Sequence, residues 1–246
     1  MKNKIILAVL LCGLTAVSWS VAARQTTNPS VDDILARYVT TLGGRAAISK
    51  HTSRTSKGTL EVVGVTTDGT VESYAKAPNK YLSIINIPDY GQIRRCYDGT
   101  TGWLSGPDPS NIQPLTGVDL ASTRRDANFY QSLDLKKLYP QLALKEKEDV
   151  GGFPAYVVEA NSGEGTVRRL YFDVSSGLLV RNDEITTTPQ GQDLVQSFLE
   201  DYREVDGVKQ PHTVRQVHGK IVFVIRLTEV KMDVPIEDSI FAKPAA

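Results

Sequence analysis

The chain has 246 residues, which is the length of one large domain or two small ones. It carries 28 Lys and Arg and 28 Asp and Glu, so its formal net charge is zero, which argues against a nucleic-acid-binding protein. Hydrophobic residues make up 41% and charged residues 23%, which are ordinary globular values and exclude a globally disordered chain.

The first 23 residues have the pattern of a secretory signal peptide. Lys2 and Lys4 give a positive start, an apolar stretch covers residues 5–17, and small residues at 21–23 suit a signal peptidase. We expect cleavage after Ala23, export to the periplasm of a bacterial cell envelope, and a single domain over residues 24–246. A membrane anchor is the weaker alternative, because glycine and hydroxyl residues interrupt the apolar stretch.

The two cysteines have different fates in this interpretation. Cys12 follows Leu11, where a lipoprotein signal needs a small residue, so the sequence disfavours lipid attachment at Cys12 but leaves it open. Cys96 alone remains after cleavage, and a lone cysteine forms no disulfide within the chain. We interpret Cys96 as a small buried apolar residue in a strand.

The mature chain begins with a predicted helix over residues 31–42. Ser30 and Asp33 form a start that resembles a capping box, and apolar residues then recur at helical spacing. Gly43 and Gly44 end the helix, because glycine accepts the left-handed conformation of a C-terminal cap.

Short strands joined by turns follow this helix. Asp68-Gly69 and Asp98-Gly99 are strong hairpin signals. The strand over residues 80–87 has apolar residues on both faces, which indicates that both sides of the sheet are covered there. The strands expected in this part are 55–65, 70–76, 80–87, 92–97 and 102–105.

Alternation is lost between residues 118 and 138, where a looser helical pattern predicts one or two inserted helices before Pro140. Strands then return and are joined by short glycine-containing turns, so neighbours in sequence should pair antiparallel. The strands expected in this part are 142–148, 153–160, 167–174, 178–185, 193–205, 208–217 and 221–230.

About a dozen strands joined by hairpins predict one large antiparallel sheet, and such a sheet curls. We expect a mainly β, α+β fold in which this sheet forms an incomplete β-barrel. The N-terminal helix and the inserted helices should lie on its concave side, the inserted helices as a lid.

No catalytic constellation is visible. The sequence lacks the serine elbow of α/β-hydrolases and the glycine-rich phosphate loops. His51, His212 and His218 come without a matching cluster of cysteines or carboxylates, so we interpret them as surface or edge residues rather than metal ligands. The sequence therefore predicts no catalysed reaction, no cofactor and no metal.

Arg124 and Arg125 lie in the inserted helical segment. Solvated helix charges are the default interpretation of this pair, and contact with an anionic head group is the alternative.

Three short motifs resemble a known family. They are Tyr-Ala-Lys-Ala-Pro-Asn-Lys-Tyr at 74–81, Tyr-Asp-Gly-Thr-Thr-Gly-Trp at 97–103, and Asp-Ser-Ile-Phe-Ala-Lys-Pro at 238–244. They are similar to the motifs of LolA/LolB-like periplasmic carriers, and most closely to the broad group of outer-membrane lipoprotein-sorting proteins. Leu42-Gly43-Gly44 and the segment 201–208 have analogues in that group.

The resemblance implies an incomplete barrel with a helical lid, which holds acyl chains in an apolar cavity without a cofactor. The carriers have an arginine directly before the motif proline, where this chain has Ala77 before Pro78. Lys76 matches the neighbouring lysine of the family motif.

Two hypotheses about function follow. The first is a periplasmic carrier of a lipid or lipoprotein, most simply a monomer, with acyl chains as its partners. The alternative is a sensor or accessory module on the same fold that binds an envelope protein, with the exposed sheet or the acidic hairpin at 200–206 as its dock. Strand parity assigns these candidates to the ligand cavity: Tyr81, Ile85, Trp103, Phe129, Leu133, Phe172 and Phe223.

Overall fold

The computed structural model describes residues 28–65, 68–108, 110–188 and 191–244. The expected signal peptide and its cleavage site lie outside these residues. Within them, no helix combines the length and the apolar character needed to cross a membrane. They form one antiparallel sheet of 14 strands together with four α-helices, which confirms the predicted mainly β, α+β class.

The first helix, α1 (Val31–Thr41), begins as the sequence predicts. The Asp33 backbone N–H donates to the Ser30 hydroxyl at 3.2 Å, and the Ser30 backbone N–H donates to the Asp33 carboxylate at 3.0 Å, which completes the capping box. A second helix, α2 (Gly44–Lys50), follows at once and was not predicted. Gly43 separates the two helices with a φ of 124°, and a Cβ there would lie 2.1 Å from the Gly207 carbonyl oxygen, so only glycine fits.

The first half of the sheet is the predicted meander. The strands expected at 80–87 and 102–105 have the predicted bounds, and the others differ by a few residues at their ends. One strand of three residues, β6, is too short to show alternation in the sequence. The strands of this half are β1 (Ser53–Val62), β2 (Gly69–Lys76), β3 (Lys80–Ile87), β4 (Gly91–Tyr97), β5 (Gly102–Ser105) and β6 (Ile112–Pro114).

Two helices, α3 (Gly117–Asp126) and α4 (Gln131–Leu138), stand where the sequence loses its alternation. The strand expected over residues 142–148 is instead two short strands, which pair with successive parts of the same neighbour. The remaining strands are close to prediction. The second half contains β7 (Gln141–Leu144), β8 (Glu148–Val150), β9 (Phe153–Asn161), β10 (Thr166–Asp173), β11 (Leu179–Thr188), β12 (Gly191–Val205), β13 (Val208–His218) and β14 (Ile221–Met232).

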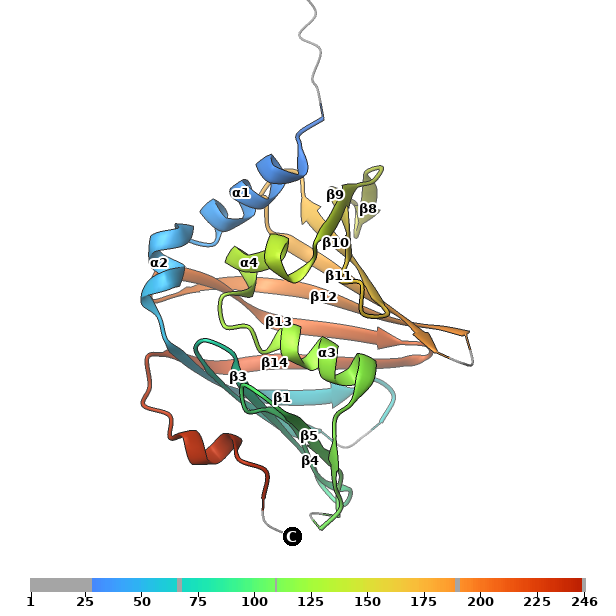
Figure 1. Ribbon diagram of the computed structural model, residues 1–246. Coiled ribbons are helices and arrows are strands. Elements are labelled where there is room, and N and C mark those ends of the chain that lie inside the picture. The colour runs from blue at the N-terminus through green and yellow to red at the C-terminus, as the bar shows by residue number, and fades with distance from the viewer. Residues whose placement is uncertain (1–27, 66–67, 109, 189–190, 245–246) are drawn as a thin grey trace, which may run out of the picture.

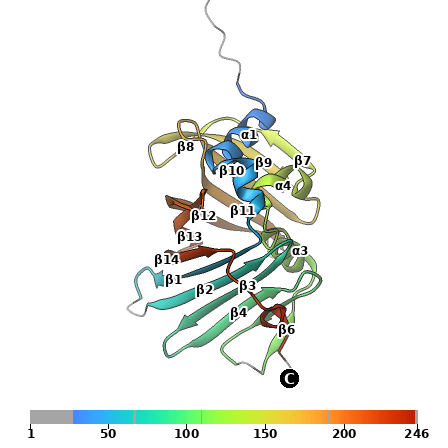
Figure 2. The same cartoon turned by 90° about the vertical axis from the view of Figure 1, so that its left-hand side faces the viewer.

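The two halves meet where the first strand pairs with the last. The strand order is β6-β5-β4-β3-β2-β1-β14-β13-β12-β11-β10-β9-β7, with β8 also paired to β9. The terminal strands β6 and β7 do not pair with each other, so the sheet curls without closing, as expected for an incomplete barrel. The helices lie together over one face of the sheet (Figure 1), and the second view shows how the sheet curves around that face (Figure 2).

One part of the concave face is filled by helices. The apolar stripe of α1 packs with α2 and α4 on β9 and β10, and the Tyr38 and Phe172 rings meet edge to face at 5.2 Å. Val158 and Ala160 on β9 are fully buried beneath these helices. This part of the molecule is an ordinary dry core.

The outer face of the first meander is covered as well. The C-terminal segment, with its short helix η1 (Asp238–Phe241), crosses the outside of β2 to β5 (Figure 2). Ile236 and Phe241 pack there on Leu82, Cys96 and Trp103. This cover explains why the strand at 80–87 is apolar on both faces, as the sequence indicated. It also confirms that Cys96 is buried.

Candidate functional site

A cavity of about 700 Å³ lies between the helices and the part of the concave face formed by β1, β3, β4 and β10 to β14. Pockets that bury one small ligand have volumes of roughly 300–1,000 Å³, so this cavity suits a single small molecule. Its apolar wall lies mainly where α1 and α2 meet β12 and β13. This wall includes Leu42, Ile48, Leu179, Leu199, Tyr202 and Val208.

Another part of the wall is polar and charged. Arg54 on β1, Arg95 on β4 and Arg168 on β10 line it, together with Gln210 and Gln216 on β13. The cavity is therefore amphipathic, which differs from the purely apolar cavity that the family resemblance implies.

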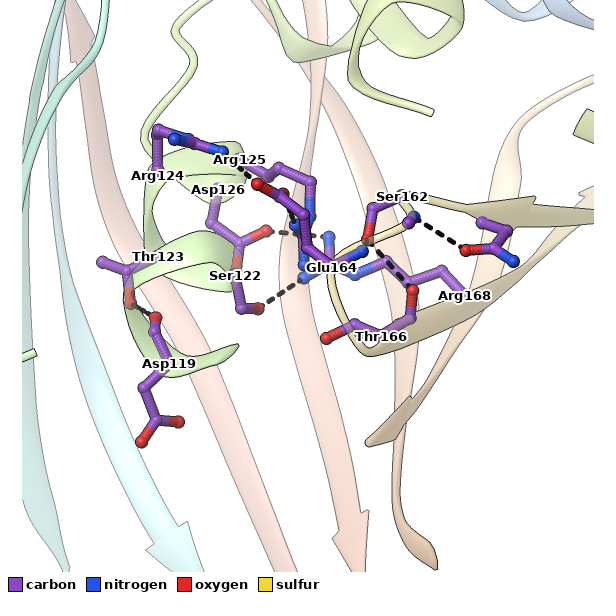
Figure 3. A network of polar contacts seen from close by, with 12 residues as sticks. Asp119, Ser122, Thr123, Arg124, Arg125, Asp126, Ser162, Glu164, Thr166 and Arg168 are labelled. Carbon is purple, nitrogen blue, oxygen red and sulfur yellow. Dashed lines mark hydrogen bonds and ion pairs between the residues drawn. The ribbon is translucent and has the colours of Figure 1, made fainter. Parts of the chain in front are cut away.

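Arg168 ties the inserted helix α3 to the strands. Its guanidinium lies 2.8 Å from the Asp126 carboxylate through Nη1 and donates through Nε to the Glu184 carboxylate at 2.7 Å. The Ser122 hydroxyl donates to Glu184 at 2.9 Å, and Figure 3 shows Ser122 and Asp126 of α3 facing Arg168. Burial alone lowers the pKa of Arg168, but the neighbouring carboxylates outweigh it and raise this pKa well above its ordinary value.

A second tie connects α3 to the turn between β9 and β10. The Glu164 carboxylate accepts from Arg124 Nη2 at 2.5 Å and from Arg125 Nη1 at 2.6 Å, so it lies between the two guanidinium groups (Figure 3). Arg124 remains half-exposed, but the Arg125 side chain is only 3% exposed. The interpretation of both arginines as solvated helix charges is therefore wrong for Arg125, because the turn bearing Glu164 covers it.

Some of the residues assigned by strand parity lie in the cavity wall. Tyr81 on β3, Phe129 between α3 and α4, and Phe223 on β14 are lining residues. Ile85 is on the same face of β3 as Tyr81, but it pairs across the sheet with Val71 and Ile93 and is not part of the lining.

The other assigned residues lie in the packed regions. Phe172 is on the helix-covered part of the concave face, and Leu133 packs against the same core. Trp103 is 2% exposed on the outer face of β5, where its Nε1–H donates to the Phe241 carbonyl oxygen at 3.2 Å. Alternation separates the two faces of a strand but does not say which face meets the cavity when both are covered.

Sequence reasoning missed several lining residues, among them Leu199 and Tyr202 on β12. They are three residues apart, so simple alternation assigns them to opposite faces. Asp201 between them has a φ of 52°, in the left-handed region, and this interrupts the alternation so that both side chains reach the cavity. Aspartate adopts this conformation more readily than most residues, which was the only signal in the sequence.

The expectation that the three histidines are surface or edge residues is wrong for two of them. His51 is 3% exposed, with Nδ1 2.7 Å from the Asp233 carboxylate and Nε2 3.1 Å from the Asp206 carbonyl oxygen. His212 is also buried, and only His218 is at the surface as predicted. Among the residues that the structure describes, no three His, Cys, Asp or Glu side chains are grouped as metal ligands.

Parts of the three motifs that carry the family resemblance meet on the outer face, whereas Tyr81, at the end of the first motif, lines the cavity. Lys76 Nζ donates to the Asp238 carboxylate at 2.7 Å, and Lys80 Nζ lies 2.9 Å from it. Their hydrogen bonds lower the pKa of Asp238 to about 2. Together with the bond from Trp103 to Phe241, these contacts fasten the C-terminal segment to the sheet. These motif residues therefore have a structural role.

Comparison with solved structures confirms the resemblance at the level of the fold. A DUF1329 family protein from Desulfovibrio piger has a TM-score of 0.58 at 16% identity, over 86% of this chain and 97% of that protein. A LolA superfamily protein from Nitrosomonas europaea has a TM-score of 0.58 at 15% identity, over 88% of this chain and 99% of that protein.

A third structure is described as a putative outer membrane lipoprotein-sorting protein domain from Vibrio parahaemolyticus. It has a TM-score of 0.53 at 9% identity, over 78% of this chain and 90% of that domain. No protein-family model matches the sequence, and no curated protein matches it either. The chain thus shares its fold with LolA superfamily proteins across nearly their whole length.

Proposed function

We propose that this chain, which shares the fold of LolA superfamily proteins, is exported to the periplasm and carries an amphiphile whose acyl chain lies in the cavity. The fold comparison supports a carrier, and the lipoprotein-sorting name of the Vibrio protein agrees with a lipid or an acylated protein as cargo. The pattern of residues 1–23 supports export. The proposal involves binding and release without any bond made or broken.

The amphipathic lining of the cavity carries the proposal. An acyl chain that leaves water for the apolar wall near Leu199 and Val208 gains about 25 cal/mol for each Å² of apolar surface buried. The polar wall near Arg54 and Arg95 offers donors that an entirely hydrocarbon ligand leaves unused. An amphiphile satisfies both walls at once.

The helix α3 suits the role of a movable cover. Polar contacts to Glu164 and Arg168 fasten it to the sheet, whereas α1 is anchored by the apolar side chains of the dry core. Water can replace the polar contacts of α3 when this helix moves, whereas it cannot replace the apolar contacts of α1, so α3 is the easier of the two helices to move.

The first experiment is mass spectrometry of organic extracts from the secreted protein, purified without detergent. We expect a stoichiometric amphiphile and an intact protein mass that begins at Arg24. A clean extract, followed by no binding of a fluorescent fatty acid in vitro, overturns the carrier proposal. Capture of an envelope protein through the acidic hairpin at 200–206 would then favour the interaction module.

Two leucines of the same strand give a matched pair of variants. Leu199 lines the cavity, whereas Leu194 on β12 is 42% exposed. Leu199→Asp places a carboxylate against the acyl chain, and we expect at least a tenfold loss of fatty-acid affinity. Leu194→Asp should bind like the parent protein. Circular dichroism of both variants establishes that each is folded, and equal affinities would exclude this cavity as the acyl site.

A further inference from the structure

The charges of the cavity wall do not balance. Arg54, Arg95, Arg168 and Lys209 line it, whereas among the described residues only Asp126 and Glu184 supply lining carboxylates. Both of these carboxylates bind Arg168. The positive charges of the remaining basic residues therefore face the cavity without a lining carboxylate of their own.

Arg54 is the clearest case. Its Nη1 donates to the Gln210 side-chain oxygen at 2.9 Å, and among the described residues it takes part in no ion pair. Burial lowers the pKa of this guanidinium, although arginine stays protonated in proteins. A guanidinium that is partly removed from water and faces a neutral amide is costly to fold around, because its charge is not compensated. Such a residue is a candidate for binding an anion.

Arg95 on β4 presents further hydrogen-bond donors, on the other side of Tyr81 from Arg54. Its Nε is buried and has no hydrogen-bond partner among the described residues. Its only described ion pair is with Asp119, a carboxylate whose side chain is 77% exposed, at the long distance of 3.7 Å from Nη2. An exposed pair of this length is worth little, so the guanidinium is available to a ligand.

Tyr81 lies between the two arginines. It shares a cross-strand row of the concave face with Arg54, through Ala75. Burial raises the pKa of the Tyr81 hydroxyl, and the charges of Arg54 and Arg95 both act to lower it, so both guanidinium groups are within electrostatic reach of this hydroxyl. Asp126 also acts on Tyr81, but Arg168 holds that carboxylate at 2.8 Å.

The geometry points to Arg54, Tyr81 and Arg95 as the site that receives an anionic oxyacid head group, a carboxylate or a phosphate ester, of the carried amphiphile. This inference rests on the proposed carrier function and adds the class of head group. Two planar guanidinium forks and a phenol O–H offer several donors in a partly dry wall, which is the chemistry that binds an oxyanion. The acyl chain then extends along the apolar wall toward Leu199 and Val208.

The test compares two single-chain lipids with the same acyl group, lysophosphatidate and the uncharged monoacylglycerol, as competitors of a bound fluorescent fatty acid. We expect lysophosphatidate to bind about 10- to 100-fold more tightly, since hydrogen bonds to charged groups contribute at this level. Arg54→Gln and Arg95→Gln should each reduce this ratio about tenfold or more, because the affinity for lysophosphatidate falls much further than that for monoacylglycerol. Arg226→Gln is the matched control, because this arginine is exposed and pairs with Glu61 outside the cavity.

The outcomes separate this inference from the proposed function. Binding of neither lipid overturns both. Equal binding of the two lipids, or an unchanged ratio in the arginine variants, overturns the head-group site alone. Inorganic phosphate is the third competitor, and displacement as effective as that by lysophosphatidate would show a site for a free anion instead. If Arg54→Gln does not fold, Arg54→Lys keeps the charge but loses the fork, and an intermediate ratio is then expected.

Discussion

The same curled sheet has two different interiors. Over β9 and β10 its concave face bears residues such as Leu170 and Phe172, and the helices α1, α2 and α4 bury them in a dry core. Over β1 and β13 the corresponding face bears Arg54, Gln210 and Gln216 and leaves a cavity of about 700 Å³. The comparison shows that the apolar side chains of the helices fill only part of the concave face, and that the part left hollow bears polar and charged side chains.

Two phenylalanines provide the strongest test of this comparison. Phe172 is 1% exposed in the filled part, so Phe172→Ala should lower the free energy of unfolding by about 3–5 kcal/mol. Phe223 lines the cavity, so its truncation creates little new empty space, and Phe223→Ala should lower it by about 1 kcal/mol. Urea unfolding followed by circular dichroism measures both. Equal losses would mean that the cavity is packed in solution.

The tie between α3 and the β9–β10 turn gives the second largest expected effect. Glu164→Gln leaves the buried Arg125 guanidinium without its anionic partner, and we expect a loss of about 1–3 kcal/mol in stability. Hydrogen exchange should become faster over residues 117–126 of α3 and stay unchanged over residues 31–41 of α1. Glu146→Gln, at an exposed position, is the control. Uniformly faster exchange would show that α3 is part of one core with α1.

The smallest expected effect concerns the outer face, where the C-terminal segment is fastened. The folded pKa of Asp238 is about 2, below the ordinary value of 3.8. Its contribution to stability is therefore present above about pH 3.8 and is lost as the pH falls toward 2. Trp103, the single tryptophan of residues 24–246, reports on this contact by fluorescence.

Asp238→Asn should remove the acid-induced change in Trp103 fluorescence that protonation of Asp238 causes. It should leave ligand binding in the cavity unchanged. An acid titration of Trp103 fluorescence that is identical in the variant and the parent protein contradicts the assignment.

Much of the fold could be predicted from the sequence because it depends on local patterns. The capping box at Ser30 and Asp33 determines where α1 begins, and alternation with glycine turns determines most strand bounds. The short helix α2 was missed because the glycines before it read as a stop, and Ile48 is its only buried side chain. Of the site, sequence parity placed Tyr81, Phe129 and Phe223 among residues that the structure finds in the cavity wall.

The sequence by itself determined the class of the protein, the order of its elements and the covered state of both faces of β3, since these depend on spacing and on neighbours along the chain. Only the tertiary structure decided that Trp103 faces the C-terminal segment 138 residues away, and that His51 is buried against Asp233, 182 residues away. It also decided which part of the concave face stays hollow. These outcomes depend on which distant segment covers a given face, and no local pattern of residues encodes that choice.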